Sequence, residues 1–261
     1  MFKTIGTDAE VFVADIESGA IESSIGLIKG TKKKPQPTRH GFIQKDNILA
    51  EFNSTPASNV ISFIDSVEAA MGDLQEYLFE YGKAIKIQAH NFMEPKWLEP
   101  LEAQQFGCDP DLNVWNLDKI HKVNAGTAGN LRTAAAHVHI GIREPSVENQ
   151  IALAMLCDLY LGIPSLKADA DDTRRRLYGQ AGHFRPKDYG IEYRVLSNFW
   201  LADADYMAFV FYAAKKAANN LNNYGTLQWC KDNGDLLQTT INNRDIEAAK
   251  AICQMFEMDM W

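Results

Sequence analysis

Alternating polar and apolar residues mark several short stretches in the first two hundred positions of the chain. Residues 7–13 and 134–142 show this alternation most clearly, and it is typical of strands with one buried face. Other short apolar runs lie between turn-forming residues. We therefore predict β-strands at residues 7–13, 24–28, 47–53, 84–89, 134–142 and 191–195.

Apolar residues at helical spacing predict the helices. The clearest case begins after a cap at Ser58 or Asn59 and extends to about Tyr81. Residues 29–41, with three consecutive lysines and two prolines, are expected to form a loop, and residues 92–130 a long irregular connection that partly covers a site. Further helices are predicted at residues 147–161, at 171–176 and, as a set of three or four, from about 204 to the end.

This order of elements favours an α+β fold in one domain, residues 1–261, with a mostly antiparallel sheet and helices packed on one face. The helical C-terminal part is expected to start at about residue 204. Hydrophobic residues make up 46% of the 261 positions, which is ordinary for a soluble globular protein.

Charge and hydropathy narrow the choice of partners. The net charge of −8 argues against a general electrostatic grip on nucleic acid. The longest apolar run, residues 151–163, contains Asp158 and is too short to span a bilayer, and the first residues lack the apolar core of a signal peptide. We expect a soluble, cytoplasmic protein without nucleic-acid or membrane partners. The four cysteines include no C-x-x-C pair, so reduced thiols are expected.

The candidate chemistry lies in polar residues spaced two apart within the predicted strands. Side chains at that spacing point to the same face of a sheet. The wet face of any antiparallel strand carries polar residues, but it is usually filled with Thr, Lys, Ser and Gln. Here the pairs are Asp8 and Glu10, Glu51 and Asn53, His137 and His139, and Glu192 and Arg194.

Such a set suits a divalent cation and phosphate. Carboxylate oxygens are preferred ligands of Mg²⁺ or Mn²⁺, and an arginine fork can hold a phosphate oxygen. Phosphoryl transfer therefore fits better than a zinc hydrolase, which usually offers further histidines or cysteines nearby. No P-loop and no G-x-G-x-x-G turn occurs, so a nucleotide would bind in another way.

A second group of candidates is cationic. Residues 174–194 combine arginines with glycines, a composition that suits an anionic ligand, although a solvated basic turn is the plainer alternative. Lys32, in the loop at 29–41, could close over phosphates or simply be solvated. The candidates for holding the nucleotide or the substrate carboxylate are Arg174, Arg175, Arg176, Tyr178, Arg185, Lys32 and Asn53.

Several segments resemble the phage carboxylate–amine ligases known as COOH–NH2 ligase type 2, which are placed among proteins with the glutamine synthetase-like fold. The two most specific segments are LRTAAAHVHIG and RRRLYGQAGHFRPKDYGIEYRVLSNFWL. The others are GTDAEVFV, KGTKKKPQP, AEFNSTPAS and FGCDPDLNVW. Together they cover most of residues 5–201.

The resemblance implies a role for each pair of strand residues. It assigns the metal to Asp8, Glu10, Glu51, Glu192 and one of the two histidines, His137 or His139. Arg194 is implied to bind phosphate. The implied catalytic residues are Arg194, Glu51 and Arg185. The first pair reads D-x-E here, where the commonest form of the fold has E-x-E.

The implied reaction is the ATP- and Mg²⁺-dependent joining of a carboxylate to an amine through an acyl phosphate. The substrates would be small-molecule or peptide carboxylates and amines, and a homo-oligomer is possible. If the chain is phage-encoded, it would act in the host cytoplasm. Three alternatives stay open: a phosphotransferase of the same fold, a non-catalytic binding or assembly module, and a metal-dependent hydrolase.

Overall fold

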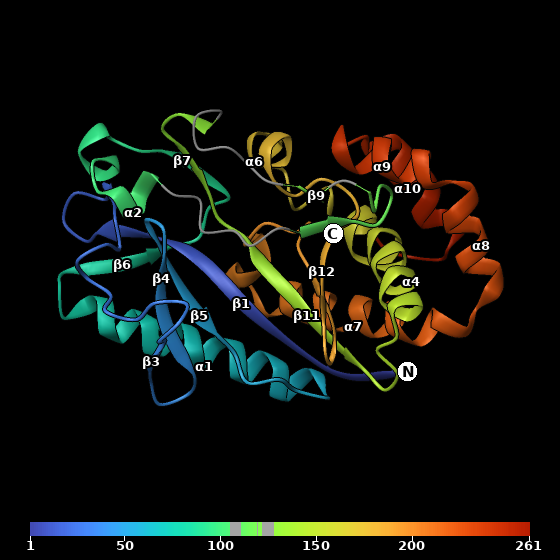
Figure 1. Cartoon of the computed structure of the whole chain (residues 1–261), viewed down its shortest axis with the longest axis horizontal. Coiled ribbons are helices and arrows are strands. Elements are labelled where there is room, and N and C mark those ends of the chain that lie inside the picture. The colour runs from blue at the N-terminus through green and yellow to red at the C-terminus, as the bar shows by residue number, and fades with distance from the viewer. Residues whose placement is uncertain (105–110, 119, 122–127) are drawn as a thin grey trace.

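A single long strand organises the fold. In this computed structural model β1, Phe2–Asp15, crosses the centre of the main sheet and pairs with β5 on one side and β11 on the other (Figure 1). The structure describes residues 1–104, 111–118, 120–121 and 128–261. Within them the sheet has 11 strands, its main path runs β3-β4-β5-β1-β11-β13-β12-β8-β9, and β2 and β6 also pair with β1.

Every strand pair among the described residues is antiparallel. The other strands of the main sheet are β2 (Ile21–Glu22), β3 (Gln36–Pro37), β4 (Phe42–Asp46), β5 (Leu49–Asn53), β6 (Lys83–Lys86), β8 (Asp111–Asn113), β9 (Ile120–His121), β11 (Ala136–Ile142), β12 (His183–Lys187) and β13 (Gly190–Tyr193). A separate two-stranded sheet joins β7 (His90–Phe92) to β10 (Leu131–Thr133).

Helices cover the apolar face of the main sheet and gather beyond one end of it (Figure 1). The longer ones are α1 (Val60–Phe79), α4 (Val147–Cys157), α7 (Ala204–Asn219), α8 (Tyr224–Asp232), α9 (Gly234–Asn242) and α10 (Ile246–Met255). The short ones are η1 (Pro95–Leu98), α2 (Leu101–Gln104), η2 (Asp158–Gly162), α5 (Ile163–Ser165), α6 (Asp172–Leu177), η3 (Phe199–Ala202) and η4 (Asn220–Asn222).

The core lies between the sheet and these helices. Asn59, one of the two caps that the sequence predicted, caps α1 by accepting a hydrogen bond from the backbone of Ser62. Phe63 on α1 is fully buried and stacks on Trp200, with ring centroids 6.0 Å apart. Phe211 on α7 lies against the same ring of Phe63, so one aromatic cluster joins both helices beneath the sheet.

Most predicted elements are present, with differences at particular points. The strand predicted at 24–28 is wrong: that segment forms a turn, in which the backbone N–H groups of Leu27 and Ile28 bond to the carbonyl of Ser24. The strands β4 and β12 were missed. Pro186 interrupts the alternation in β12, so the sequence pattern did not indicate a strand there.

The predicted helix at 147–161 ends as an α-helix at Cys157 and continues as a π-helical turn, Asp158–Gly162. The region 92–130 contains η1, α2, β8 and β9, but residues 105–110, 119 and 122–127 of that predicted connection lie outside the described residues. The fold class expected from the sequence is confirmed: a mostly antiparallel sheet with helices on its apolar face.

Candidate active site

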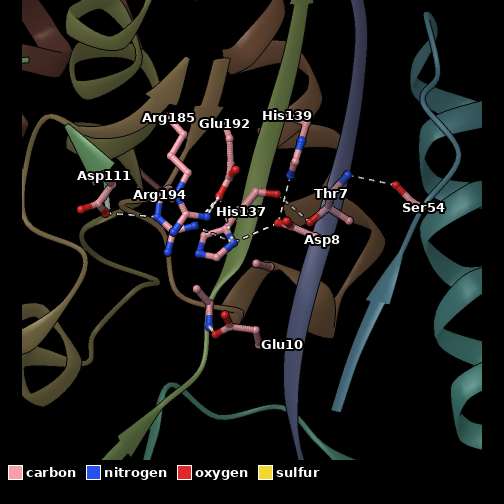
Figure 2. Close-up of polar contacts among 12 residues, drawn as sticks. Thr7, Asp8, Glu10, Ser54, Asp111, His137, His139, Arg185, Glu192 and Arg194 are labelled. Carbon is pink, nitrogen blue, oxygen red and sulfur yellow. Dashed lines mark hydrogen bonds and ion pairs between the residues drawn. The ribbon is translucent and has the colours of Figure 1, made fainter. Parts of the chain in front are cut away.

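Strand pairing brings the predicted polar pairs together on the face of the sheet opposite the helices. In the ladder Asp8 lies opposite both His137 and Asn53, and Glu10 lies opposite Glu51. Glu192 on β13 lies opposite both His139 on β11 and Arg185 on β12. Directly paired residues project to the same side, so these strands form one charged surface (Figure 2).

Asp8 is the centre of the first cluster. Its Oδ1 atom lies 2.9 Å from Nδ1 of His137 and 3.0 Å from Nε2 of His139. The other ring nitrogen of His139, Nδ1, is hydrogen-bonded to the hydroxyl of Tyr189. This contact fixes the imidazole so that Nε2 points toward Asp8 and Glu192.

Glu192 and Arg194 form the second cluster. Arg194 donates to Oε1 of Glu192 through Nη1 and to Oδ2 of Asp111 through Nε, at 3.2 Å for the latter (Figure 2). Arg185 also donates to Oε1 of Glu192, at 3.0 Å. Glu192 is fully buried, and Lys187 Nζ lies 2.7 Å from its Oε2 atom. One carboxylate is thus surrounded by three cationic side chains.

A third cluster consists of carboxylates close to one another. Glu10, Glu51 and Asp46 line the same cavity as Asp8, Glu192 and His137, together with Arg194, Arg185, Lys187 and Lys32. Glu10 and Glu51 are buried, and Oε2 of Glu10 accepts a hydrogen bond from the backbone N–H of Ala135 at 2.9 Å.

The pKa values reflect this crowding. Burial, with the charges of Asp46 and Asp8, raises the pKa of Glu10 to about 8. Burial and the neighbouring carboxylates raise the pKa of Glu51 well above its usual value. Like charges held this close favour a bound cation.

Asp8 and Glu192 shift in the opposite direction. Burial alone would raise the pKa of Asp8, but its contacts with His139 and His137 outweigh burial and lower it well below the usual value. Burial and Asp8 likewise oppose ionisation of Glu192, yet Arg194, His137 and Arg185 lower its pKa to about 2. Both groups therefore stay ionised at neutral pH.

The two histidines also differ. Burial and the nearby charge of Arg194 lower the pKa of His137 to about 4, so it is neutral at pH 7. Burial opposes protonation of His139 too, but Asp8 outweighs it and raises the pKa of that imidazole.

Asp8, His139 and Glu192 fit a metal ion. Each offers one ligand atom, and these atoms lie within 4.8 Å of one another. Oε2 of Glu192 and Nε2 of His139 are buried, and among the described residues neither atom makes a hydrogen bond of good geometry. Charged groups lie close to both: Lys187 to Glu192 and Asp8 to His139. Two oxygens and one imidazole nitrogen suit Mg²⁺ or Mn²⁺ when water or phosphate completes the coordination.

The other predicted residues are distributed around this surface. Lys32 and Arg185 line the cavity of the carboxylates. Tyr178 lines an adjoining cavity that Glu10, His137 and Arg194 share. Asn53 lines a third hollow, beside His139 and Tyr189.

The three consecutive arginines lie on α6 and differ in what they contact. Arg174 lines the cavity of Tyr178, but its guanidinium is buried and donates to the backbone carbonyls of Val195 and Arg194 at 2.8 and 3.3 Å. Arg175 is buried and donates to the carbonyl of Asp169 at 2.8 Å. Arg176 is exposed and, among the described residues, is outside the lining of either cavity.

Sequence reasoning missed Asp46 and Asp111, and it placed Lys187 only within the cationic stretch 174–194, without a role of its own. Asp111 lies inside the segment FGCDPDLNVW, but its strand is only three residues long and shows no alternation. Asp46 ends β4, a strand that was not predicted. Lys187 is two positions from Arg185 on β12, so the i, i+2 spacing could have found it once that strand was recognised.

Comparison with known families supports a ligase. Residues 123–234 match the model of the family described as phage phiEco32-like COOH.NH2 ligase-type 2. The family resemblance is confirmed over this stretch, which includes its two most specific segments. The matched stretch contains both histidines of β11, together with Arg185, Glu192 and Arg194.

Curated proteins and solved structures show no similarity or only weak similarity to this chain. No curated protein matches the chain. One solved structure, described as the crystal structure of a novel glutamine synthase homolog, is similar with a TM-score of 0.40 and 9% sequence identity. The similarity covers 97% of this chain and 66% of that one, so this chain spans about two thirds of its length. None of the helices in the described residues is long and apolar enough to cross a bilayer.

Proposed function

We propose that the chain is an ATP- and Mg²⁺-dependent carboxylate–amine ligase, with Mn²⁺ as a possible substitute for Mg²⁺. The observation that carries this proposal is the convergence of Asp8, His139 and Glu192 on one point beside the Arg194 guanidinium. The family match over residues 123–234 supports the ligase part of the proposal.

The proposed metal ligands are Asp8, Glu192 and one or both histidines, and Glu10 and Glu51 line the same cavity. A bound Mg²⁺ would neutralise phosphate charge. Because His137 is neutral at pH 7, its ring keeps a lone pair available for a cation.

The cationic side chains would position the phosphates. Arg194 is held from two sides, by Glu192 and by Asp111, so its planar fork has little freedom to turn. Arg185 and Lys32 line the same cavity. Preorganised charges of this kind stabilise the negative charge of a transferring phosphoryl group without reorganising during the reaction.

The proposed reaction has two steps. An oxygen of the substrate carboxylate attacks the γ-phosphorus of ATP, the bond to ADP breaks, and an acyl phosphate forms. The nitrogen of an amine then attacks the acyl carbon, and inorganic phosphate leaves as the amide forms. The amine must lose a proton, for which Glu51 is the proposed acceptor. The substrates are small-molecule or peptide carboxylates and amines.

Calorimetry of ATP binding with and without Mg²⁺ tests the site. Wild type should bind ATP only with Mg²⁺, and Glu192→Gln and Arg194→Lys should each weaken binding by about 100-fold, as expected for loss of a charged contact in a buried site. Glu68→Gln, at an exposed position of α1, is the matched control and should bind as wild type does. Folded wild type that binds no Mg²⁺–ATP would refute the proposal.

ADP release then separates a ligase from a phosphotransferase. A ligase forms the amide and completes its cycle only when carboxylate and amine are both present. Sustained ADP release with a single phosphoryl acceptor and no amine would instead support the phosphotransferase. Pools of amino acids and short peptides are suitable first substrates.

A further inference from the structure

Away from the charged surface, a buried carboxylate joins three separate parts of the fold. Asp158 is fully buried in the π-helical turn η2. Its Oδ1 accepts hydrogen bonds from the backbone N–H of Gly182 at 3.0 Å and from the hydroxyl of Tyr193 at 2.8 Å. Its Oδ2 accepts one from Nε1 of Trp115 at 2.7 Å. The three donors come from the start of β12, from β13 and from the segment after β8.

Three glycines make this arrangement sterically possible. A Cβ atom on Gly182 would lie 2.4 Å from Cδ1 of Trp115, and one on Gly234 would lie 2.7 Å from the same indole. A Cβ on Gly162 would lie 2.8 Å from the hydroxyl oxygen of Tyr193. Gly182 also has a φ of +81°, a backbone conformation that favours glycine. The packing around Asp158 is therefore specific to these donors.

The indole of Trp115 is connected to β8 through a short series of bonds. The backbone N–H of Trp115 donates to Oδ1 of Asn113, the last residue of β8, at 2.9 Å. The backbone N–H of Val114 donates to the carbonyl of Gly182 at 2.9 Å. β8 pairs with β12 at two positions and with β9 at two, so its ladders are short and contacts beyond them add to its placement.

β8 begins with Asp111, and Asp111 orients Arg194. Oδ2 of Asp111 accepts the hydrogen bond from Nε of Arg194 on the side opposite Glu192 (Figure 2). A continuous series of contacts thus leads from Asp158 through Trp115 and β8 to the guanidinium on the charged surface.

We propose that Asp158 is a positioning residue, which holds β8 in place through the Trp115 indole so that Asp111 fixes the guanidinium of Arg194. Its value for catalysis rests on the proposed function, in which Arg194 binds phosphate. The neighbouring donors are consistent with a dedicated role, because a buried carboxylate without partners is strongly destabilising. Asp158 does not line the cavities of the charged surface, so it acts at a distance.

Two variants that each remove one hydrogen-bond donor to Asp158 separate positioning from general stability. Trp115→Phe removes the Nε1 donor and cuts the connection to β8. Tyr193→Phe removes a donor to the same carboxylate but leaves that connection intact, and the Tyr193 side chain alternates to the opposite face from Glu192 and Arg194. Both variants deprive Asp158 of one partner. Trp115→Phe also removes ring volume that packs against Gly182 and Gly234, so urea unfolding of both variants measures the general loss of stability separately.

The direct readout is the rate of hydrogen exchange at Nε–H of Arg194, measured by ¹⁵N NMR. The signal of this group is assigned by its absence from the spectrum of Arg194→Lys. Trp115→Phe should speed this exchange by about tenfold, comparable to the loss of one buried hydrogen bond, whereas Tyr193→Phe should leave it within about twofold of wild type. Asp158→Asn, which places an amide N–H₂ or a weaker acceptor against the indole, is the second variant should Trp115→Phe fail to fold, and it should also speed exchange.

Magnesium–ATP binding supplies a second readout, and Trp115→Phe should weaken it by about tenfold while Tyr193→Phe should not. If folded wild type binds no ATP, the proposed function fails, but the Arg194 exchange rate still decides the positioning. An exchange rate unchanged in folded Trp115→Phe, or raised equally in both variants, would overturn the inference.

Discussion

The two faces of the central strands differ in chemistry, although the same backbone carries both: one is apolar and the other is charged. On β1, Ala9 and Val11 point into the apolar core and are fully buried. Asp8 and Glu10, on alternate positions, point into a surface that gathers like charges. The first face lowers the free energy of the fold by burying apolar area, whereas the second stores unfavourable interactions that a ligand can relieve.

This contrast appears in the pKa values on the charged face. Three carboxylates have raised pKa values because burial and neighbouring carboxylates, Asp8 among them, oppose their ionisation: Glu10, Glu51 and Asp46. A stabilising surface would have paired each of them with a cation. The difference teaches that the apolar face determines the fold, whereas the charged face carries the proposed function.

The largest expected effect is on the apolar face. Phe63→Ala should lower the free energy of unfolding by about 3–5 kcal/mol, because it removes a fully buried ring that packs on Trp200 and Phe211. Urea unfolding followed by circular dichroism measures the change.

Ile61→Ala on the same helix is the control, since Ile61 is 69% exposed, and it should change the unfolding free energy by no more than about 0.5 kcal/mol. Alanine has the higher helix propensity in both cases, so a similar loss in both variants would show that burial of the Phe63 ring does not set the cost on this face.

A smaller effect distinguishes the two histidines on the charged face. The pKa of His137 is about 4 in the folded protein against 6.5 for a free imidazole, so the unfolded chain takes up a proton first as the pH falls. In metal-free wild type His137 should therefore reduce the unfolding free energy by up to about 3 kcal/mol between pH 6.5 and pH 4, with no contribution above pH 7. His137→Asn should remove this loss.

His139 provides the contrast, because its pKa is raised by Asp8. Its protonation should stabilise the fold at low pH, and this contribution should disappear as the pH rises through the folded pKa. His139→Asn should therefore steepen the loss of stability on acidification. Urea unfolding in chelator from pH 4 to pH 8 compares all three proteins, and parallel pH profiles would contradict the assigned directions.

The sequence predicted the charged face better than it predicted the sheet that carries it. Alternation identified Asp8, His137 and Glu192, since side-chain direction on a strand follows from position alone. It could not reveal that Glu10 lies opposite Glu51, because register depends on pairing between distant segments.

Short elements were harder to predict. Two-residue strands and the three-residue β8 contain too few positions for a periodic signal, so Asp111 was missed. The arginines of α6 show the limit of composition: Arg174 looked like a ligand for an anion, yet its guanidinium donates to the backbone carbonyls of Val195 and Arg194. Only tertiary structure distinguishes these uses.

The smallest expected effect is a gain in stability, whereas Phe63→Ala is expected to lower stability. It tests whether the crowded carboxylates of the charged face destabilise the folded protein. Burial and the nearby carboxylates raise the folded pKa of Glu51 well above 4.5, so wild type should lose stability as the pH rises from 4.5 toward that folded value. Glu51→Gln keeps the shape and removes the charge. We expect it to be about 1 kcal/mol more stable than wild type at pH 8 and nearly equal at pH 4.5.

Urea unfolding in chelator measures this difference, and Glu68→Gln on the solvent side of α1 is the control. The same Glu51→Gln protein should bind Mg²⁺–ATP more weakly than wild type, because the crowded carboxylates are the proposed metal environment. A gain in stability together with a loss of binding would show that one residue serves function against stability. If Glu51→Gln is instead less stable at pH 8, then Lys32 and Arg185 already compensate the carboxylates, and the two faces of the sheet differ less than their pKa values imply.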